Sequence, residues 1–366
     1  MYNLSDYIRR ASKLINNAFF PGHKKLSTLM FYSTSLCNSK CKHCMIWARK
    51  PVVHMSKAKV VEIMQSRCIS KHTTVGLEGG EFLLHPEAME ILKWFSENHP
   101  NFELLSNGLQ SHRVIEAVKK YPPKRLYISL DGGKDTYSYM RGVDGFDKVI
   151  AIIEACKDIV PVSVMFTLSP YNTFDDLNYV VAIAEKQAVD IRIGIYSDID
   201  FFNTVDKAHD TGIGEIIAGK NEANAVDFKA QIPESVKKTS ENYDFLLLYD
   251  EWKNKRLKLN CYSIFDSLVI HPDGNVPICQ NLDVSLGNVN ENSLDQIYNG
   301  MVSQKRQKQY ARSCNQCWVN FHRKYDIVLL RSLESLMPKS FIELFYGKYH
   351  WTNDRKMTYK RFLQKY

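Results

Sequence analysis

Residues 31–44 read FYSTSLCNSKCKHC and place Cys37, Cys41 and Cys44 on one short segment with the spacing C-x3-C-x2-C. An apolar, β-prone run precedes the segment. Three thiolates on one loop can hold three irons of a four-iron cluster, whereas most clusters are held by four thiolates. Because no fourth cysteine follows nearby, one iron would stay open to bind a substrate or a cofactor. The spacing therefore indicates reactive chemistry and not only electron storage.

Zinc knuckles and disulfides are the alternatives for closely spaced cysteines. The chain has nine cysteines, an odd number, and its N-terminus lacks the continuous apolar segment and small-residue cleavage site of a secretory signal. Disulfides are therefore disfavoured, and a reducing, cytoplasmic compartment is expected. Zinc stays open as an alternative, and His43 lies inside the triplet.

The composition is that of an ordinary globular chain, with 366 residues, 45% hydrophobic and 24% charged. This length allows one barrel-sized domain and a smaller one. No apolar run approaches the ~20 residues that span a bilayer. The net charge of +8 comes from basic ends, residues 1–29 and 318–366. Basic ends usually form solvated faces, although they can attract an anionic partner. We find no nucleic-acid-binding motif.

Apolar periodicity predicts an amphipathic helix over residues 4–19 and then an alternation of strands and helices. The predicted strands are 28–33, 74–78, 102–106, 125–130, 162–167 and 191–196. The predicted helices between them are 57–68, 86–98, 111–120, 146–157 and 174–186. Such an alternation indicates an α/β fold of parallel strands with right-handed crossovers. Six strands fall short of the eight of a closed barrel.

The alternation stops after the sixth strand, where the chain becomes polar and charged. This polar stretch is either a surface insertion or a cap over the barrel mouth, because it follows the sixth strand directly. The expected divisions are an N-terminal helix at 1–27, a barrel at 28–197, an insertion or cap at 198–260, a small cysteine-bearing module at 261–320 and a basic, helical C-terminal extension at 321–366.

Short polar motifs follow three of the predicted strands, at the edge where parallel barrels form their active sites. Strand two is followed by GGE at 79–81, and the two glycines let a ligand approach the backbone closely. Strand three ends in SNG at 106–108, which alone would be an ordinary turn. Strand four ends in SLDG at 129–132, with RG following at 141–142.

These motifs, in order behind the cysteine triplet, resemble the radical S-adenosylmethionine (radical SAM) superfamily over roughly residues 28–320. The triplet is the superfamily's signature. The GGE resembles its Gly-Gly-Glu-Pro motif, with Phe82 in the place of the usual proline. The resemblance implies a partial (β/α)6 TIM-like barrel, followed by a small C-terminal β-hairpin/α domain that binds an auxiliary cluster.

The resemblance also implies the cofactor contacts. Cys37, Cys41 and Cys44 would hold a 4Fe–4S cluster whose open iron is chelated by the amino and carboxylate groups of S-adenosylmethionine (SAM). The residues expected to bind SAM are Gly79, Gly80, Glu81, Asn107, Ser129, Asp131, Arg141 and Ile193.

Individual roles follow for some of these residues. Ser129 would contact the ribose, Arg141 would pair with the SAM carboxylate through its guanidinium fork, and backbone groups near Ile193 would hold the adenine. Asp131 has three alternative roles, which are a ribose contact, a substrate contact or a loop cap. His43 is expected to pack near the cluster without ligating it.

A second cysteine group lies in the C-terminal part of the chain and consists of Cys261, Cys279, Cys314 and Cys317. Residues 268–279 predict a β-hairpin turned at Asp273–Gly274, which would bring Cys279 back beside Cys261. On chemistry alone, four thiolates in two pairs suit zinc or a fully ligated cluster about equally.

The spacing of this second group resembles the auxiliary-cluster domains called SPASM and twitch. No cysteine follows Cys317, so the expected form is twitch-like, with a second 4Fe–4S cluster held by four protein thiolates and acting as an electron relay or acceptor. Cys68 and Cys156 stand alone on predicted helices and are interpreted as buried structural thiols.

The resemblance implies an enzyme of the radical SAM oxidoreductase type. Reductive cleavage of SAM, with a reductant such as flavodoxin or ferredoxin, would yield a 5′-deoxyadenosyl radical that abstracts hydrogen from a substrate C–H bond. A polar small molecule such as a sugar, an aminocyclitol or a glycan is favoured as the substrate, dehydrogenated with the auxiliary cluster as electron relay. Only 36 residues precede Cys37, too few for the peptide-binding domain that many peptide-modifying relatives carry.

Two other functions stay open. The first is a maturase that modifies a ribosomally made peptide or a protein side chain, and the second is a non-catalytic iron–sulfur or zinc scaffold. A weak contact between the basic residues 349–366 and an anionic membrane surface is a further expectation.

Overall fold

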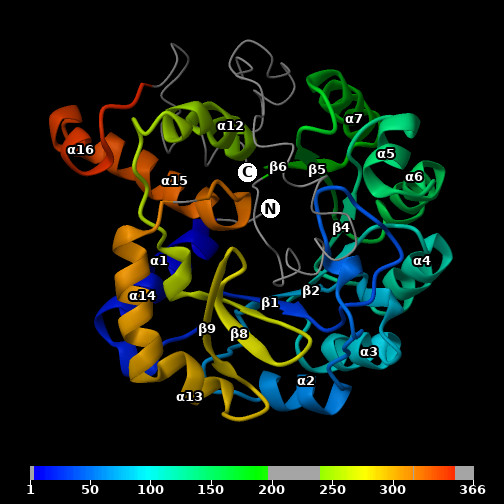
Figure 1. Ribbon diagram of the computed structural model, residues 1–366, viewed down its shortest axis with the longest axis horizontal. Helices are drawn as coiled ribbons and strands as arrows, with labels where there is room; N and C mark the ends of the chain where they lie inside the picture. Colours follow the sequence, from blue (N-terminus) through cyan, green and yellow to red (C-terminus); the bar gives the residue numbers. More distant parts are fainter. Residues whose placement is uncertain (1–3, 197–239, 316, 351–366) are drawn as a thin grey trace.

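The computed structural model describes residues 4–196, 240–315 and 317–350, and its centre is one curved sheet of seven parallel strands (Figure 1). The strands lie in the order β6-β5-β4-β3-β2-β1-β7. Six of them are the predicted strands: β1 (Thr28–Tyr32), β2 (Thr74–Glu78), β3 (Phe102–Ser106), β4 (Arg125–Ser129), β5 (Val162–Leu168) and β6 (Asp190–Ile195). Neighbours along the chain pair in parallel. The expected α/β partial barrel is confirmed.

Helices cover the outer face of the sheet, around the lower and right side of Figure 1. The predicted helices are observed as α2 (Lys57–Met64), α3 (Ala88–Asn98), α4 (Ser111–Lys120), α6 (Phe146–Cys156) and α7 (Phe174–Gln187). The helix α5 (Lys134–Arg141) was not predicted, because its sequence is mostly polar. Side chains such as Leu29, Phe31 and Val164 are fully buried. The opposite face of the same strands is therefore left for a site.

The seventh strand corrects the predicted hairpin. A turn does form at Asp273–Gly274, where Gly274 has φ 85° and the His271 amide donates to the Asn275 carbonyl at 2.9 Å. The segment before this turn is β7 (Ser267–Ile270), which pairs in parallel with β1. Its four residues are all buried, as expected for a short apolar strand of a parallel sheet. It joins the barrel because it covers the free edge of β1.

The small antiparallel hairpin lies one strand later than predicted. It consists of β8 (Asn275–Cys279) and β9 (Leu282–Asn288), and the chain turns between them at residues 280–281. Cys279 therefore lies at the end of β8, beside the turn. A small C-terminal hairpin is confirmed, with a different turn.

Helices also fill the C-terminal part of the molecule: α12 (Ser240–Lys253), α13 (Leu294–Asn299), α14 (Met301–Ser313), α15 (Asn320–Leu336) and α16 (Lys339–Tyr346). Trp318 is fully buried, and its ring stacks on Phe245 with 5.5 Å between ring centroids, which joins α12 to the start of α15. The side chain of Asn320 donates to the Ile193 carbonyl at 3.0 Å, which ties α15 to β6. The C-terminal part thus packs on the open side of the sheet.

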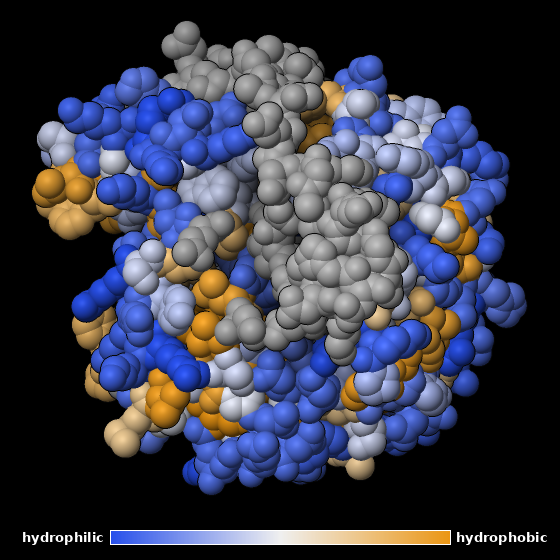
Figure 2. Space-filling model, viewed as in Figure 1, coloured by the Kyte–Doolittle hydropathy of each residue, from blue (hydrophilic) through white to orange (hydrophobic). Residues whose placement is uncertain are grey.

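The N-terminal helix α1 (Leu4–Phe19) is observed over the predicted residues. Most of the expected cap and the basic tail lie outside the described residues, at 197–239 and 351–366. No helix in the described ranges is long and apolar enough to cross a bilayer. Figure 2 shows a mostly hydrophilic face, with an apolar patch at its left edge over α16, where Phe341, Leu344 and Phe345 are exposed.

Candidate cysteine-lined active site

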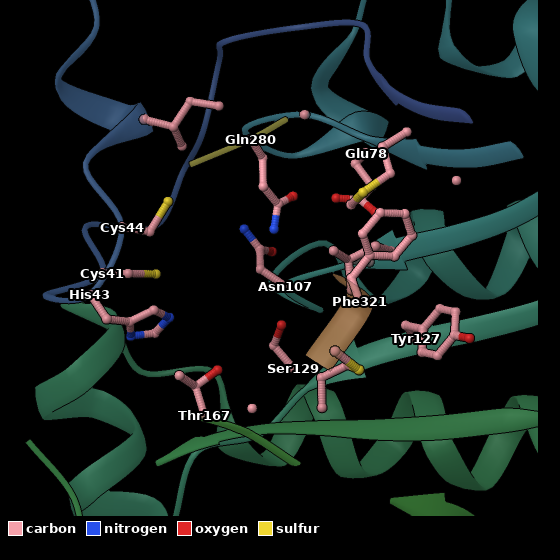
Figure 3. Close-up of a pocket in the computed structure, with 18 of the residues that line it drawn as sticks. Cys41, His43, Cys44, Glu78, Asn107, Tyr127, Ser129, Thr167, Gln280 and Phe321 are labelled. Carbon is pink, nitrogen blue, oxygen red and sulfur yellow. The ribbon is translucent and has the colours of Figure 1, made fainter. Parts of the chain in front are cut away.

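The inner side of the sheet encloses a cavity of about 400 Å³. Residues of β1–β6 line it, and on most of these strands they alternate, because successive side chains of a strand point to opposite faces. They include Met30 and Tyr32 on β1 and Glu78 on β2. Phe321, on the first turn of α15, and Gln280, from the β8–β9 turn, complete the wall (Figure 3). The barrel and the C-terminal part therefore share one cavity.

The three-cysteine loop lies at the end of β1 and lines this cavity with Cys37, Cys41 and Cys44. Burial, with a smaller contribution from the neighbouring cysteines, raises the pKa of the Cys37 thiol to about 12 and that of the Cys44 thiol to about 11. The three groups thus lie close enough to repel one another as thiolates. A positively charged iron cluster would relieve both this repulsion and the cost of burial.

The GGE motif binds the backbone of this loop through hydrogen bonds. The Gly80 amide donates to the Thr34 carbonyl at 2.7 Å, and the Glu81 amide donates to the Leu36 carbonyl at 2.8 Å. A Cβ atom on Gly80 would lie only 2.2 Å from the Leu36 oxygen. From the sequence we expected these glycines to admit a ligand, but the group that approaches them in the structure is the backbone of the cysteine loop.

Glu81 joins the ends of two strands. Its buried carboxylate accepts hydrogen bonds from the Ser106 hydroxyl at 3.0 Å and from the Asn107 amide at 2.8 Å. Burial raises the pKa of Glu81 to about 6, and these hydrogen bonds act in the opposite direction. The Asn107 side chain in turn donates to Asn38 on the cysteine loop at 2.9 Å. These contacts fix the loop relative to β2 and β3.

Asp131 and Arg141 form a buried ion pair beside the loop. Arg141 Nε donates to Asp131 at 2.7 Å, its Nη2 donates to the same carboxylate oxygen, and its Nη1 lies 3.5 Å from Cys41 Sγ. The other oxygen of Asp131 accepts from the Thr167 amide at 2.9 Å. Asp131 therefore anchors the arginine, a role that was not among the three expected for it, and its contact with the ribose or the substrate stays a prediction. A pairing of Arg141 with SAM stays a prediction.

Three further residues from the sequence predictions, Ser129, Ile193 and His43, also line the cavity. His43 lies beside Cys41 and Cys44 in Figure 3. Burial lowers the pKa of His43 to about 4, so its ring is neutral at physiological pH, and its Nδ1 has no hydrogen-bond partner. The three cysteines and the residues predicted to bind SAM, apart from Asp131, thus line one cavity.

The second cysteine group comes together from separate segments of the chain. Cys261 precedes a short 3-10 helix, Cys279 ends β8, and Cys314 and Cys317 lie between α14 and α15. Burial, with smaller contributions from the nearby Cys317 and Cys314, raises the pKa of the Cys279 thiol to about 12. Burial also raises the pKa of Cys261, with a smaller contribution from Cys317. The four thiols therefore form one electrostatically coupled group.

Arg323 is a component of this second group that we did not identify from the sequence. It is fully buried, and it donates to the carbonyls of Cys317 at 2.9 Å and Leu259 at 2.8 Å. Its Nη1 lies 3.3 Å from Asp326. Although burial opposes its charge, Asp326 and the nearby cysteines raise the pKa of Arg323 above its usual value. The only sequence signal was an Arg-x-x-Asp pair shortly after Cys317.

The thiols of the two groups can ligate an iron–sulfur cluster, and four thiolates also suit structural zinc. Among the residues that the structure describes, no three His, Cys, Asp or Glu side chains form a group that could hold a metal ion.

Comparison with known proteins matches both parts of the molecule. Residues 31–182 match the family model of the radical SAM superfamily, and residues 261–318 match that of SPASM, an iron–sulfur cluster-binding domain. The expected single-cluster, twitch-like form stays a prediction.

Two curated relatives show how far the similarity extends. The antilisterial bacteriocin subtilosin biosynthesis protein AlbA of Bacillus subtilis is 25% identical over 296 residues, which are 78% of this chain and 63% of that protein. A probable GTP 3′,8-cyclase of Saccharolobus solfataricus is 25% identical over 162 residues, which are 43% of this chain and 53% of that protein. The chain thus spans less than two thirds of either relative.

Solved structures show a similar fold. Streptococcus suis SuiB bound to precursor peptide SuiA superposes with a TM-score of 0.59 at 13% identity, over 84% of this chain and 72% of SuiB. SuiB bound to S-adenosylmethionine superposes with a TM-score of 0.56 at 14% identity, over 82% of this chain and 72% of SuiB. At these identities the likeness establishes the fold alone.

Proposed function

The chain belongs to the radical SAM superfamily and carries a SPASM domain, and on this premise we propose that it is a maturase that modifies a ribosomally made peptide. The radical SAM domain implies a 4Fe–4S cluster and SAM, and the SPASM domain implies auxiliary iron–sulfur clusters.

One observation favours a peptide as the substrate. Similarity to AlbA extends over 78% of the chain, well beyond the barrel, whereas similarity to the GTP cyclase covers 43%. AlbA is named for the biosynthesis of a bacteriocin, and SuiB has been solved with a precursor peptide. Our expectation that a small molecule is favoured over a peptide is therefore wrong. The short segment before Cys37 was a poor guide to the substrate.

In this proposal the bound cluster and SAM supply the 5′-deoxyadenosyl radical that abstracts hydrogen from the peptide. Cys37, Cys41 and Cys44 would ligate that cluster. Asp131 holds the Arg141 guanidinium beside Cys41, where it can meet the SAM carboxylate. Ser129, which also lines the cavity, would meet the ribose.

The part of the cavity between the two cysteine groups would receive the peptide. Gln280 reaches into it between Cys44 and Glu78 (Figure 3), and the Gln280 amide oxygen is buried without a hydrogen-bond partner. A peptide N–H would satisfy that oxygen, because buried acceptors cost about 1–3 kcal/mol when left unpaired. Burial raises the pKa of Glu78 to about 7, so this carboxyl group can accept a proton near neutral pH.

The test uses the full chain, reconstituted anaerobically with iron and sulfide and incubated with SAM and dithionite. About eight irons per chain are expected from two four-iron sites. The probes are synthetic peptides translated from short reading frames that flank the gene, with GTP as the small-molecule control. We expect 5′-deoxyadenosine and a mass change in one peptide. Consumption of GTP with every peptide unchanged would overturn the proposal.

A further inference from the structure

The turn between β8 and β9 wraps around a thiol of the second cysteine group. Cys279 is the last residue of β8 and pairs with Leu282 of β9, so the turn itself consists of Gln280 and Asn281. The backbone amide of Asn281 donates to Cys279 Sγ at 3.4 Å. The side chain of Asn281 is therefore held next to the place where a cluster would be ligated.

The polar atoms of the Asn281 side chain are buried, although the residue as a whole is partly exposed. Neither its amide nitrogen nor its amide oxygen is accessible to solvent, and neither forms a hydrogen bond of normal geometry within the protein. A buried polar atom without a partner is unfavourable, because it has lost its hydrogen bonds to water. An asparagine that served only to make a turn would keep its amide in water. The unpaired amide indicates a group that the protein chain itself does not supply.

The position of this side chain identifies that group. Burial raises the pKa of the Cys317 thiol, and the Arg323 guanidinium and the Asn281 side-chain amide both act in the opposite direction. Together with the backbone contact of Asn281 to Cys279 Sγ at 3.4 Å, this places the side-chain amide beside the thiols of the second group, where its N–H is the part that can stabilise a thiolate. Arg323 adds a buried positive charge to the same group.

We propose that the side-chain amide of Asn281 donates an N–H···S hydrogen bond to the auxiliary cluster, at the Cys317 sulfur or an adjacent sulfide, and thereby raises the reduction potential of that cluster. Reduction adds one negative charge to the cluster, and a donor at its sulfur stabilises the added charge. The inference rests on the cluster that the SPASM domain implies. It is independent of whether the substrate is a peptide.

The experiment measures a reduction potential. In the full-length chain with Cys37, Cys41 and Cys44 changed to Ala, the second group is the cluster site that remains intact. Its midpoint potential is measured by redox titration followed by electron paramagnetic resonance. Asn281→Leu should shift the potential to a more negative value.

Asn260→Leu is the matched control. Asn260 directly precedes Cys261, but it is exposed, and its amide donates to the Tyr262 hydroxyl at 3.3 Å. This variant should keep the parent potential. An unchanged potential in Asn281→Leu, or an equal shift in both variants, would overturn the proposal.

Two more variants separate the hydrogen bond from side-chain volume. Asn281→Gln keeps an amide donor and should lie closer to the parent potential than Asn281→Leu; a potential as negative as that of the leucine variant would count against the N–H···S bond. Asn281→Ala removes the donor without adding a charge, so it replaces the leucine variant if the latter loses its iron. If the parent chain, with its three alanine substitutions, binds no iron, the second group holds no cluster and the proposal is wrong.

Discussion

The two cysteine groups of this protein are built in opposite ways. Cys37, Cys41 and Cys44 lie on one loop after β1, and backbone hydrogen bonds from the GGE motif and from the end of α5 hold that loop. The second group takes its thiols from three segments, and buried side chains such as Arg323 and Trp318 pack around them. A local loop can be recognised from its spacing, whereas an assembled group depends on the whole domain.

Both groups nevertheless contain a buried ion pair between an arginine and an aspartate. In the first group Arg141 depends on Asp131 and points its remaining donor at Cys41. In the second, Arg323 has Asp326 and also two backbone carbonyls as acceptors. A positive charge beside thiolates lowers the cost of burying them. Arg141 therefore depends more on its aspartate than Arg323 does.

The largest effect should separate the two groups by function. Cys37→Ala should abolish 5′-deoxyadenosine formation, because the open cluster is lost, whereas Cys261→Ala should keep SAM cleavage and lose modification of the substrate. Chromatography of the SAM products and iron analysis measure both. If Cys261→Ala stops cleavage as completely as Cys37→Ala, the division of roles between the groups is wrong.

The next effect concerns the buried ion pairs. Asp131→Asn should lower the free energy of unfolding by about 3–5 kcal/mol, because it leaves a buried guanidinium uncompensated. Asp326→Asn should cost less, since Arg323 retains its carbonyl acceptors. Urea unfolding of the full chain measures both changes.

The matched control for these pairs is Asp273→Asn. Asp273 pairs with Arg49 near the surface, and its side chain is 38% exposed. Its loss should cost no more than about 1 kcal/mol. A larger loss for Asp326→Asn than for Asp131→Asn would reverse the comparison of the two arginines.

Gly80→Ala should damage the first group alone. The added Cβ would meet the Leu36 carbonyl, so the cysteine loop must shift, at a cost of about 3 kcal/mol. The variant should lose iron from the three-cysteine site and keep iron at the second group. Gly22→Ala is the control, since a Cβ there would meet nothing within 4 Å. Full iron retention in Gly80→Ala would show that the loop tolerates the shift.

The smallest effect concerns the cavity between the groups and depends on pH. Burial raises the pKa of Glu78 from 4.5 to about 7, so the folded chain binds this proton more tightly than the unfolded chain. Stability is therefore lost as the pH rises from 4.5 to 7. Glu78→Gln removes this loss. Its free energy of unfolding should therefore exceed that of the wild type by about 1–2 kcal/mol at pH 8 and by little at pH 5.

Thermal unfolding at the two pH values measures this gain. Glu62→Gln is the control, because Glu62 pairs with Lys59 and its side chain is 61% exposed. A gain of the same size at pH 5 would mean that side-chain packing, and not ionisation, sets the cost of Glu78.

Much of the barrel was predictable because its signals are local. The strands β2 and β3 and the helix α4 have the predicted bounds, since apolar periodicity and turn residues act within a few positions. The helix α5 was missed because its polar sequence has no clear apolar stripe. The strand β7 was missed as a barrel strand because its partner, β1, lies more than 200 residues earlier in the chain.

The candidate site shows the same difference between local sequence signals and long-range contacts. The triplet, the GGE motif, Ser129 and Arg141 were readable from the sequence, because they belong to short motifs in a fixed order along the chain. Their roles were only partly readable. The glycines admit the cysteine loop, and Asp131 anchors an arginine. Such roles depend on which backbone or charge lies opposite, and spacing alone does not encode that.

The sequence by itself determined the alternating α/β order, the three-cysteine loop and the existence of a second cysteine set, because these are patterns of neighbours along the chain. Only the tertiary structure decided that β7 completes the sheet, that Arg323 lies among the second set of thiols, and that Asn281 has a buried amide without a partner. The physical reason is burial, because the cost of an unpaired charge or amide depends on everything that surrounds it.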